Sequence, residues 1–320
     1  MKFSEIKENI LSKYSVRQRK KFWFVAILLF YPIAQFLLFY VYVNFSSFFI
    51  AFQDNYGAWT TENFQRVFDG FFGEVGGLRK ELFRSFITWC VGMFVSFPMS
   101  VLMSYALWKK IPGNKAFRVI LYFPTMLGGV VCTRLFKYLC AYNGPILTVV
   151  KWLGFTLPEA LAQAGLFGYV GTAFPTILFY SIWIGIGGNL IVLTGALVRI
   201  PNEVLEAGKL DGVGFFREFW QIAIPLIYPT LNTLMIFSMA GIFTADAGTF
   251  LFTRNGGYET STIGFRLFIE VYYISNAGVG AGNTAYGYPA ALGMILSVIT
   301  IPLVLVWRHF LEKHLEAVGY

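Results

Sequence analysis

Residues 173–196 read AFPTILFYSIWIGIGGNLIVLTGA and contain no charged side chain. An α-helix rises about 1.5 Å per residue, so about 20 apolar residues cross the hydrocarbon core of a bilayer. In water such a stretch would expose a large apolar surface, whereas in lipid its side chains face acyl tails without penalty. This segment therefore predicts a transmembrane helix.

Five further apolar runs of similar length flank this segment, at 22–43, 82–108, 117–140, 222–246 and 286–307. The whole chain is 57% hydrophobic and 13% charged, with a mean hydropathy of +0.61, which is far too apolar for an ordinary soluble domain. The first run follows a basic stretch, as a secretory signal does, but it is longer than the apolar core of a signal peptide. We therefore expect an all-α polytopic membrane protein with about six transmembrane helices.

Basic residues are unevenly distributed between the two sides of such a bundle. Most of the 25 Lys and Arg residues lie in the N-terminal segment, in the connections after the second and fourth runs, and after the last run. The positive-inside rule places these parts, and hence both termini, in the cytoplasm. The expected organisation is a basic segment at 1–21, a membrane domain at 22–310 and a tail at 311–320. The net charge of +8 then reflects topology, and no nucleic-acid partner is expected.

The cytoplasmic connection 199–221 reads RIPNEVLEAGKLDGVGFFREFWQ and has the chemistry of a helix, a break and a second helix. Glu203 and Glu206 favour the positive, N-terminal end of the first helix. Asp211-Gly212 then provides a turn in which the glycine is free to take positive φ. The connection therefore predicts a short helix presented to the cytoplasm.

Two small residues, Ala207 and Gly208, follow Glu206 on this helix. Small side chains let a helix lie close to another protein's backbone, and charged flanks can fix the orientation of the contact. Such a helix is suited to be a mechanical coupling element between this chain and a partner.

This connection resembles the EAA motif of binding-protein-dependent ABC importer permeases, whose pattern is E-A-A, D-G-A and a later I-x-L-P. The matching segments are Glu206-Ala207-Gly208, Asp211-Gly212-Val213 and Ile222-Ala223-Ile224-Pro225. Gly208 and Val213 replace the usual Ala, and Ile224 replaces the usual Leu; glycine at 208 is expected to cost the helix about 1 kcal/mol. By this match, the residues implied to couple to an ATPase are Glu203, Glu206, Ala207, Gly208, Asp211 and Gly212.

Other stretches are similar to the maltose-type sugar permeases in particular. They are TENFQRVF at 61–68, FRVILYFP at 117–124, YNGPIL at 142–147, FLFTRNGGYETSTIG at 250–264 and AYGYPAALGMIL at 285–296. The resemblance implies the type I importer fold in a bacterial cell membrane, with the chain embedded in lipid. It also implies a second homologous permease, two cytoplasmic ATPases docked on the coupling loops, and an external solute-binding protein that delivers a carbohydrate.

The chain contains no G-x-x-x-x-G-K-[ST] loop, so it cannot cradle ATP in that way. The resemblance implies a transport subunit that is not an enzyme and has no cofactor of its own. ATP and Mg would belong to the partner ATPases.

The fifth run suggests where a solute would pass. Asn232, Met239 and Asp246 are seven residues apart, and Phe243 and Phe250 share nearly the same stripe of a continuous helix. Sugar hydroxyls need polar partners and sugar C–H faces favour aromatic contact, so these five residues are the predicted pathway. Alternatively, Asn232 only bonds a neighbouring helix and Asp246 lies in the outer headgroup region.

The segment 260–274, TSTIGFRLFIEVYYI, places Arg266 and Glu270 four residues apart among apolar neighbours. Residues at this spacing are neighbours on a helical surface. The segment predicts an amphipathic helix on the outer surface.

Three other functions remain open. The chain could be an ABC permease for a non-sugar solute, or a secondary transporter driven by an ion gradient, although acidic or His relays inside the helices are not evident. A membrane-embedded enzyme is the third reading. The cysteines and histidines have no metal-ligand spacing, and no nucleophile elbow or paired carboxylates are found, so neither a catalytic residue nor a metal site is expected.

Overall fold

The computed structural model describes residues 16–54, 56–73, 77–156, 158–246, 248–253, 257, 259–276 and 286–317. Apart from one isolated bridge between Gln53 and Trp59, the regular secondary structure of these residues is helical, and turns and irregular segments connect the helices. Most of the basic N-terminal segment predicted at 1–21 lies outside the described residues. The helices up to the fourth span are α2 (Val16–Gln35), η1 (Phe36–Tyr42), α3 (Val43–Ala51), α4 (Glu62–Phe72), α5 (Leu78–Val91), η2 (Gly92–Ser96), α6 (Phe97–Trp108), α7 (Asn114–Met126), α8 (Gly129–Leu139), α9 (Pro145–Trp152), α10 (Glu159–Ala164) and α11 (Val170–Leu197). The remaining helices are α12 (Asn202–Leu210), α13 (Phe215–Glu218), η3 (Phe219–Ala223), α14 (Ile224–Ala240), α15 (Thr249–Thr253), α16 (Ile263–Asn276) and α17 (Gly287–Ala317).

Five continuous helical stretches in the described residues are long and apolar enough to cross a bilayer: Lys20–Ala51, Leu78–Trp108, Val170–Leu197, Phe215–Ala240 and Gly287–Lys313. Three of them contain a short π-helical segment, η1, η2 or η3, without interrupting the helix. In lipid a spanning backbone must satisfy its own hydrogen bonds, and a continuous helix does so. These stretches confirm five of the six predicted spans.

The prediction of one continuous span over 117–140 is wrong, because this run forms two helices. Helices α7 and α8 meet at an angle of 115°. The break falls at Leu127 and Gly128, whose ψ angles of 142° and 136° are those of extended backbone, three residues after Pro124. Pro124 has no N–H to donate within the helix, which weakens the turn that precedes the break. The expected number of about six spans holds when this bent pair counts as one.

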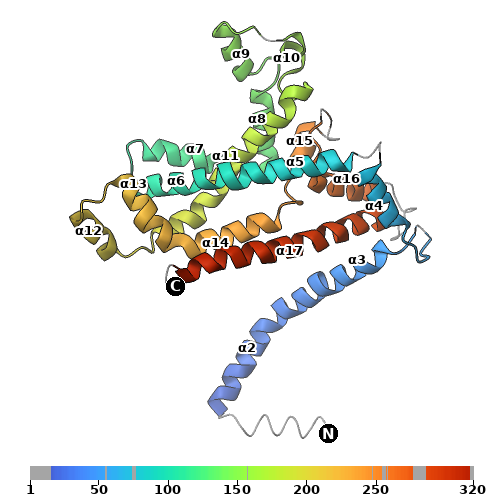
Figure 1. Ribbon diagram of the computed structural model, residues 1–320, viewed down its shortest axis with the longest axis horizontal. Coiled ribbons are helices and arrows are strands. Elements are labelled where there is room, and N and C mark those ends of the chain that lie inside the picture. Colours follow the sequence, from blue (N-terminus) through green and yellow to red (C-terminus); the bar gives the residue numbers. More distant parts are fainter. Residues whose placement is uncertain are drawn as a thin grey trace.

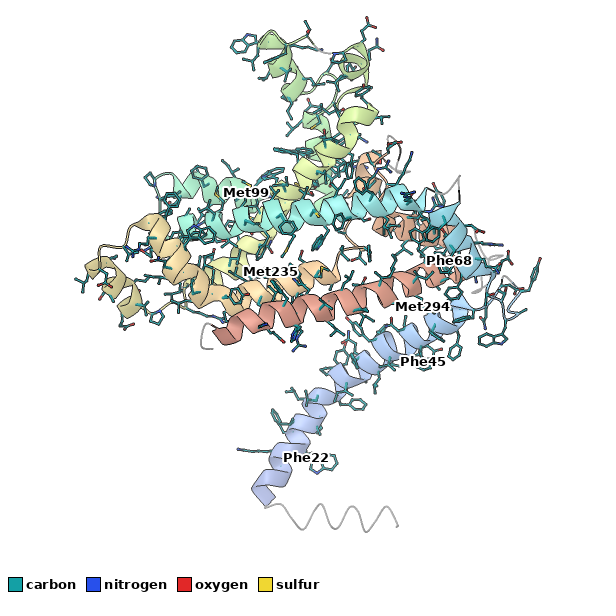
Figure 2. The ribbon with its side chains drawn as sticks, viewed as in Figure 1. Phe22, Phe45, Phe68, Met99, Met235 and Met294 are labelled. Atoms are coloured by element: carbon teal, nitrogen blue, oxygen red, sulfur yellow. The ribbon has the colours of Figure 1, made fainter. Side chains whose placement is uncertain are left out.

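The spans pack into a bundle in which α11 lies along α6 and α7, and α17 contacts α14, α3 and α4 (Figure 1). The N-terminal helix α2 leaves this bundle, and its large apolar side chains are exposed (Figure 2). Phe22, for example, is 65% exposed. Such a surface carries no penalty in lipid or against another apolar helix. At the other end of the chain, α17 continues to Ala317, through the predicted tail boundary at 310.

The amphipathic helix predicted at 260–274 is confirmed as α16, with Arg266 Nε 3.0 Å from Glu270 Oε1. The helix docks on α5 rather than lying free on the surface. The Ile263 N–H donates to Ser85 Oγ at 2.8 Å, and Ser261 Oγ donates to Glu81 Oε1 at 3.0 Å. Helix α16 is therefore tied to the start of the second span.

The packing of α11 on α7 depends on the absence of a side chain at Gly187. A Cβ built there would collide with the Leu121 carbonyl oxygen and lie 3.0 Å from Thr125 Cγ2. At Gly188 a Cβ would meet nothing within 4 Å. Small residues allow this close approach between membrane helices.

We predict that Gly187→Ala destabilises the protein by about 1–3 kcal/mol, because the methyl group forces α7 away from α11. Gly188→Ala, the matched control, should leave stability unchanged or raise it, since alanine favours the helix by about 1 kcal/mol over glycine. Thermal unfolding of both variants in detergent micelles measures the difference. Equal midpoints for the two variants would contradict the close packing.

Candidate functional site

Helix α12 forms where the sequence predicted the coupling helix and ends at a defined stop. Gly212 has φ +69°, the left-handed conformation that was expected for it. The Val213 N–H donates to the Gly208 oxygen at 2.9 Å, and the Gly212 N–H donates to the Lys209 oxygen at 3.1 Å. These two bonds form a Schellman motif, which fixes the direction in which the chain leaves the helix.

The predicted coupling residues divide between two faces of α12. Glu203, Glu206 and Ala207 are exposed, whereas Gly208 is buried. A Cβ at Gly208 would lie 2.8 Å from Ile222 Cδ1, so the glycine allows α12 to lie close to the start of the fifth span. The exposed face, together with exposed Asp211 and Gly212 at the helix end, is accessible in this chain, as the predicted contact with a partner requires. Figure 1 places α12 at one end of the long axis of the molecule, away from α3, α4 and α16.

The inner face of α12 enters an apolar cluster formed by three spans. Buried Leu205 belongs to this cluster with Tyr105 of α6, Leu197 of α11 and Phe219 of η3. The Tyr105 ring centroid lies 4.9 Å from that of Phe215 and 5.0 Å from that of Phe219. Its hydroxyl donates to the Phe215 oxygen at 3.2 Å. Helix α12 is thus packed against the second, fourth and fifth spans.

The sequence analysis missed an ion pair behind this cluster, between Lys109 and Glu218. The Lys109 side chain is 22% exposed and that of Glu218 only 8%. Lys109 follows α6, and Glu218 lies in the first turn of the continuous helix Phe215–Ala240, so each carries the charge that suits its end of its helix. Those helix-end charges were readable in the sequence, but their pairing across more than 100 residues was not.

The predicted pathway stripe depended on a continuous helix over 222–246, and this premise is wrong. Helix α14 ends at Ala240, and a turn at 241–244 redirects the chain. Asp246 therefore lies beyond the helix, where its Oδ1 accepts a hydrogen bond from the Thr249 N–H at 3.2 Å. Phe250 lies on α15, with its ring centroid 5.4 Å from those of Phe268 and Tyr272.

A groove of about 480 Å³ lies between the second, fourth and fifth spans. Its lining is rich in small and polar side chains, and among the five predicted pathway residues only Asp246 reaches it. The lining includes Trp89, Ser96, Ser181, Gly185, Asn189 and Ser238. Hydroxyl, amide and carboxylate groups around one space form a surface that can bond a polar solute.

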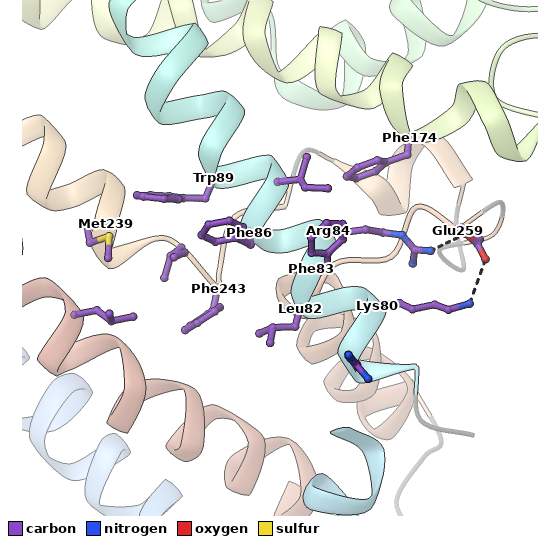
Figure 3. A pocket seen from close by; sticks show the side chains of 14 residues that line it. Lys80, Leu82, Phe83, Arg84, Phe86, Trp89, Phe174, Met239, Phe243 and Glu259 are labelled. Atoms are coloured by element: carbon purple, nitrogen blue, oxygen red, sulfur yellow. Dashed lines mark hydrogen bonds and ion pairs between the residues drawn. The ribbon is translucent and has the colours of Figure 1, made fainter. Parts of the chain in front are cut away.

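A larger cavity of about 1140 Å³ adjoins this groove and is mainly apolar (Figure 3). Met239 and Phe243, two of the predicted pathway residues, line it with Phe83 and Phe86. Figure 3 shows an ionic group at one end, where Arg84 and Lys80 contact Glu259 at 3.0 Å and 3.7 Å.

Trp89 belongs to the lining of both spaces. Its Nε1–H donates to the Ser238 oxygen at 3.1 Å, which fixes the indole ring between α5 and α14. The structure therefore brings Met239 and Phe243 together and places Asp246 in the adjoining groove. Asn232 is buried and lines neither space, and its Oδ1 has no hydrogen-bond partner among the described residues.

Comparison with known proteins identifies the family to which the chain belongs. Residues 71–315 match the model of the binding-protein-dependent transport system inner membrane component. The multiple sugar-binding transport system permease protein MsmF of Streptococcus mutans is 27% identical over 218 residues, which cover 68% of this chain and 70% of MsmF. The maltose/maltodextrin transport system permease protein MalF of Escherichia coli K12 is 28% identical over 255 residues, 77% of this chain.

The diacetylchitobiose uptake system permease protein NgcF of Streptomyces coelicolor is 28% identical over 201 residues, 60% of this chain. The matches span 52% of NgcF and 47% of MalF, so this chain corresponds to about half the length of these two relatives.

Solved structures show the same fold. A bacterial ABC transporter that imports the acidic polysaccharide alginate aligns over 93% of this chain and 98% of the matched chain, with a TM-score of 0.73 and 20% identity. Its complex with an alginate pentasaccharide-bound periplasmic protein aligns over 93% and 97%, again with a TM-score of 0.73 and 19% identity. At such identities the likeness concerns the fold alone. The family match covers most of the sequence, and the chain belongs to the binding-protein-dependent transport system inner membrane components.

Proposed function

We propose that this chain is one permease subunit of an ATP-driven importer that moves a carbohydrate from an external solute-binding protein into the cytoplasm. The observation that carries this proposal is α12, a short helix with an exposed acidic face and an inner face packed into three spans. A helix of this kind can receive a movement on one side and transfer it to the membrane bundle on the other. A transport subunit without its own nucleotide site needs such a receiver.

The relatives support the choice of solute. MsmF, MalF and NgcF are named for the transport of sugars, maltodextrins and diacetylchitobiose, and the solved transporter imports alginate. The groove fits a saccharide because Ser181, Asn189 and Asp246 offer polar groups beside the indole of Trp89. Sugar hydroxyls bond to the former and sugar C–H faces pack on the latter.

The proposed assembly contains a second permease, two ATPases and an external binding protein, because one chain offers only one coupling helix in the described residues. The ATPases bind Mg and ATP and dock on α12 from the cytoplasm. Tyr228 OH, near the start of α14, donates to the Leu311 oxygen at 3.4 Å. This contact places the end of α17 at the same end of the bundle as the coupling loop, in keeping with a cytoplasmic C-terminus in a bacterial membrane.

We predict that Glu206→Lys abolishes ATP-driven uptake because it reverses the charge on the exposed face of α12. The chain should still insert into the membrane, but the ATPases should no longer copurify with it. Asp69→Lys, the same reversal on exposed Asp69 of α4 at the opposite end, is the control and should retain the ATPases. Normal uptake by Glu206→Lys would contradict the coupling role. Wild-type uptake that survives ATP depletion but collapses with the proton gradient would favour an ion-coupled transporter.

Substitution of two asparagines distinguishes the groove from the stripe of residues that the sequence predicted as the solute pathway. Asn189 lines the groove, and Asn232 belongs to the stripe. We predict that Asn189→Leu lowers uptake about tenfold, since losing one hydrogen bond of about 1.4 kcal/mol to the moving solute changes a rate by that factor. Asn232→Leu should leave uptake unchanged, because it removes a buried oxygen without a hydrogen-bond partner in the described structure. Uptake of a labelled saccharide into vesicles holding the full transporter measures both. A larger loss of uptake in Asn232→Leu than in Asn189→Leu would instead favour the predicted stripe as the solute pathway.

A further inference from the structure

We infer that Lys109 and Glu218 form a clamp that transmits movement of the coupling loop to the second span, Leu78–Trp108. The inference rests on the proposed function, because it concerns how the movement passes beyond α12. Neither residue is one of the positions matched to the EAA motif, and the two form an ion pair in the structure.

The pair is held in place from both sides. Glu218 is buried at the first turn of the fifth span, and its backbone N–H donates to the Gly214 oxygen at 2.8 Å. The Lys109 ammonium lies 5.1 Å from the centroid of the Trp108 ring and 5.9 Å from that of Tyr105. A cation over aromatic faces and against a buried carboxylate is attracted by all of them.

Both helix dipoles favour this arrangement. The fifth span is one continuous helix from Phe215 to Ala240, and Glu218 lies at its positive, N-terminal end. Lys109 lies at the negative, C-terminal end of the second span. Each charge therefore interacts favourably with its own helix end and with its partner. If the two charges were exchanged, they would still attract each other, but each would lose its favourable interaction with the dipole of its own helix.

The backbone next to Lys109 has a strained conformation, which fixes the direction in which the chain leaves the second span. Lys110 has φ 55°, a left-handed conformation that glycine usually occupies at a helix end. The Ile111 N–H donates to the Ala106 oxygen at 3.3 Å, and the Lys110 N–H donates to the Leu107 oxygen at 3.2 Å. These are the two bonds of a Schellman stop, so the second span ends as sharply as α12 does. Such strain persists only where the surrounding contacts determine the conformation.

The clamp joins two helices that line the candidate groove. The second span contributes Trp89 and Ser96 to the groove, and the fifth span contributes Ser238. Movement of α12 reaches the fifth span directly through the chain. It reaches the second span through the Lys109–Glu218 pair and the Tyr105 contacts. The clamp therefore allows one coupling helix to move both of these groove walls together.

The test uses the complete transporter in vesicles, with both permeases, the ATPases and the binding protein. The variants are Lys109→Met, Glu218→Gln and the exchange Lys109→Glu with Glu218→Lys. The matched control is Arg217→Ala, next to Glu218, which removes an exposed bond between Arg217 Nε and Gln221 Oε1 of 2.9 Å. The readouts are the amount of assembled complex, ATP hydrolysis stimulated by the binding protein, and sugar moved per ATP.

The clamp predicts that each single variant retains its ATPases but moves about tenfold less sugar per ATP, a typical size for coupling between sites. The exchange should recover part of this loss, and Arg217→Ala should behave as the wild type. If the transporter with Glu218→Gln fails to assemble because this residue is buried, Lys109→Met, at a less buried residue, tests the same loss of sugar moved per ATP.

Three results would overturn the clamp. They are normal coupling in the single variants, no recovery in the exchange, or loss of assembled complex with unchanged sugar per ATP, which would make the pair purely structural. Failure of the wild type to bind any ATPase would instead overturn the proposed function.

Discussion

Attachment of α12 to the membrane bundle is the constraint on which the proposed function depends. Leu205 packs with Tyr105, Leu197 and Phe219, so the short coupling helix shares an apolar cluster with the second, fourth and fifth spans. A helix of nine residues is unstable alone in water, and tertiary packing supplies most of its stability. The same packing suits α12 to the transmitting role that we propose for it. Gly208, a departure from the usual alanine of the motif, lies on this packed side beside Ile222 rather than on the exposed face.

Close approach between helices continues from the coupling end into the groove. A Cβ at Gly185 would collide with Ser96 Oγ, and that hydroxyl donates to the Ile182 oxygen at 3.2 Å. The second and fourth spans can therefore approach closely beside the groove, which leaves hydroxyl and amide groups to face the space. A small shift of one span against another changes the width of such a groove, because packed helices shift between discrete arrangements. In the proposed function, this is how a movement at α12 would change the access of a solute to the groove.

Sequence reasoning succeeded where the determinant is local and failed where it is tertiary. The left-handed Gly212, the Arg266–Glu270 pair and the apolar spans follow from neighbouring residues and were predicted. The bend after Pro124 was missed because an apolar run does not reveal where its helix turns. The continuous helix assumed for the pathway stripe is absent because α14 ends at Ala240, in an apolar stretch with no strong stop signal before Gly241.

The groove lining and the Lys109–Glu218 pair were out of reach for a single sequence. Both assemble residues from separate spans, and periodicity within one helix says nothing about which face meets which neighbour. The assignments of Glu203, Glu206 and Asp211 to an ATPase contact stay predictions, since the structure shows their exposure and not their partner.

The position of α12 relative to the membrane and the ATPases is tested most directly by labelling a single cysteine placed at Glu206. The three native cysteines, Cys90, Cys132 and Cys140, would first be replaced, and a membrane-impermeant maleimide applied to right-side-out and inside-out vesicles. ATP-driven coupling predicts labelling only in inside-out vesicles, and protection from the label when the ATPases are bound. Labelling from the outside, or equal labelling with and without the ATPases, would contradict it.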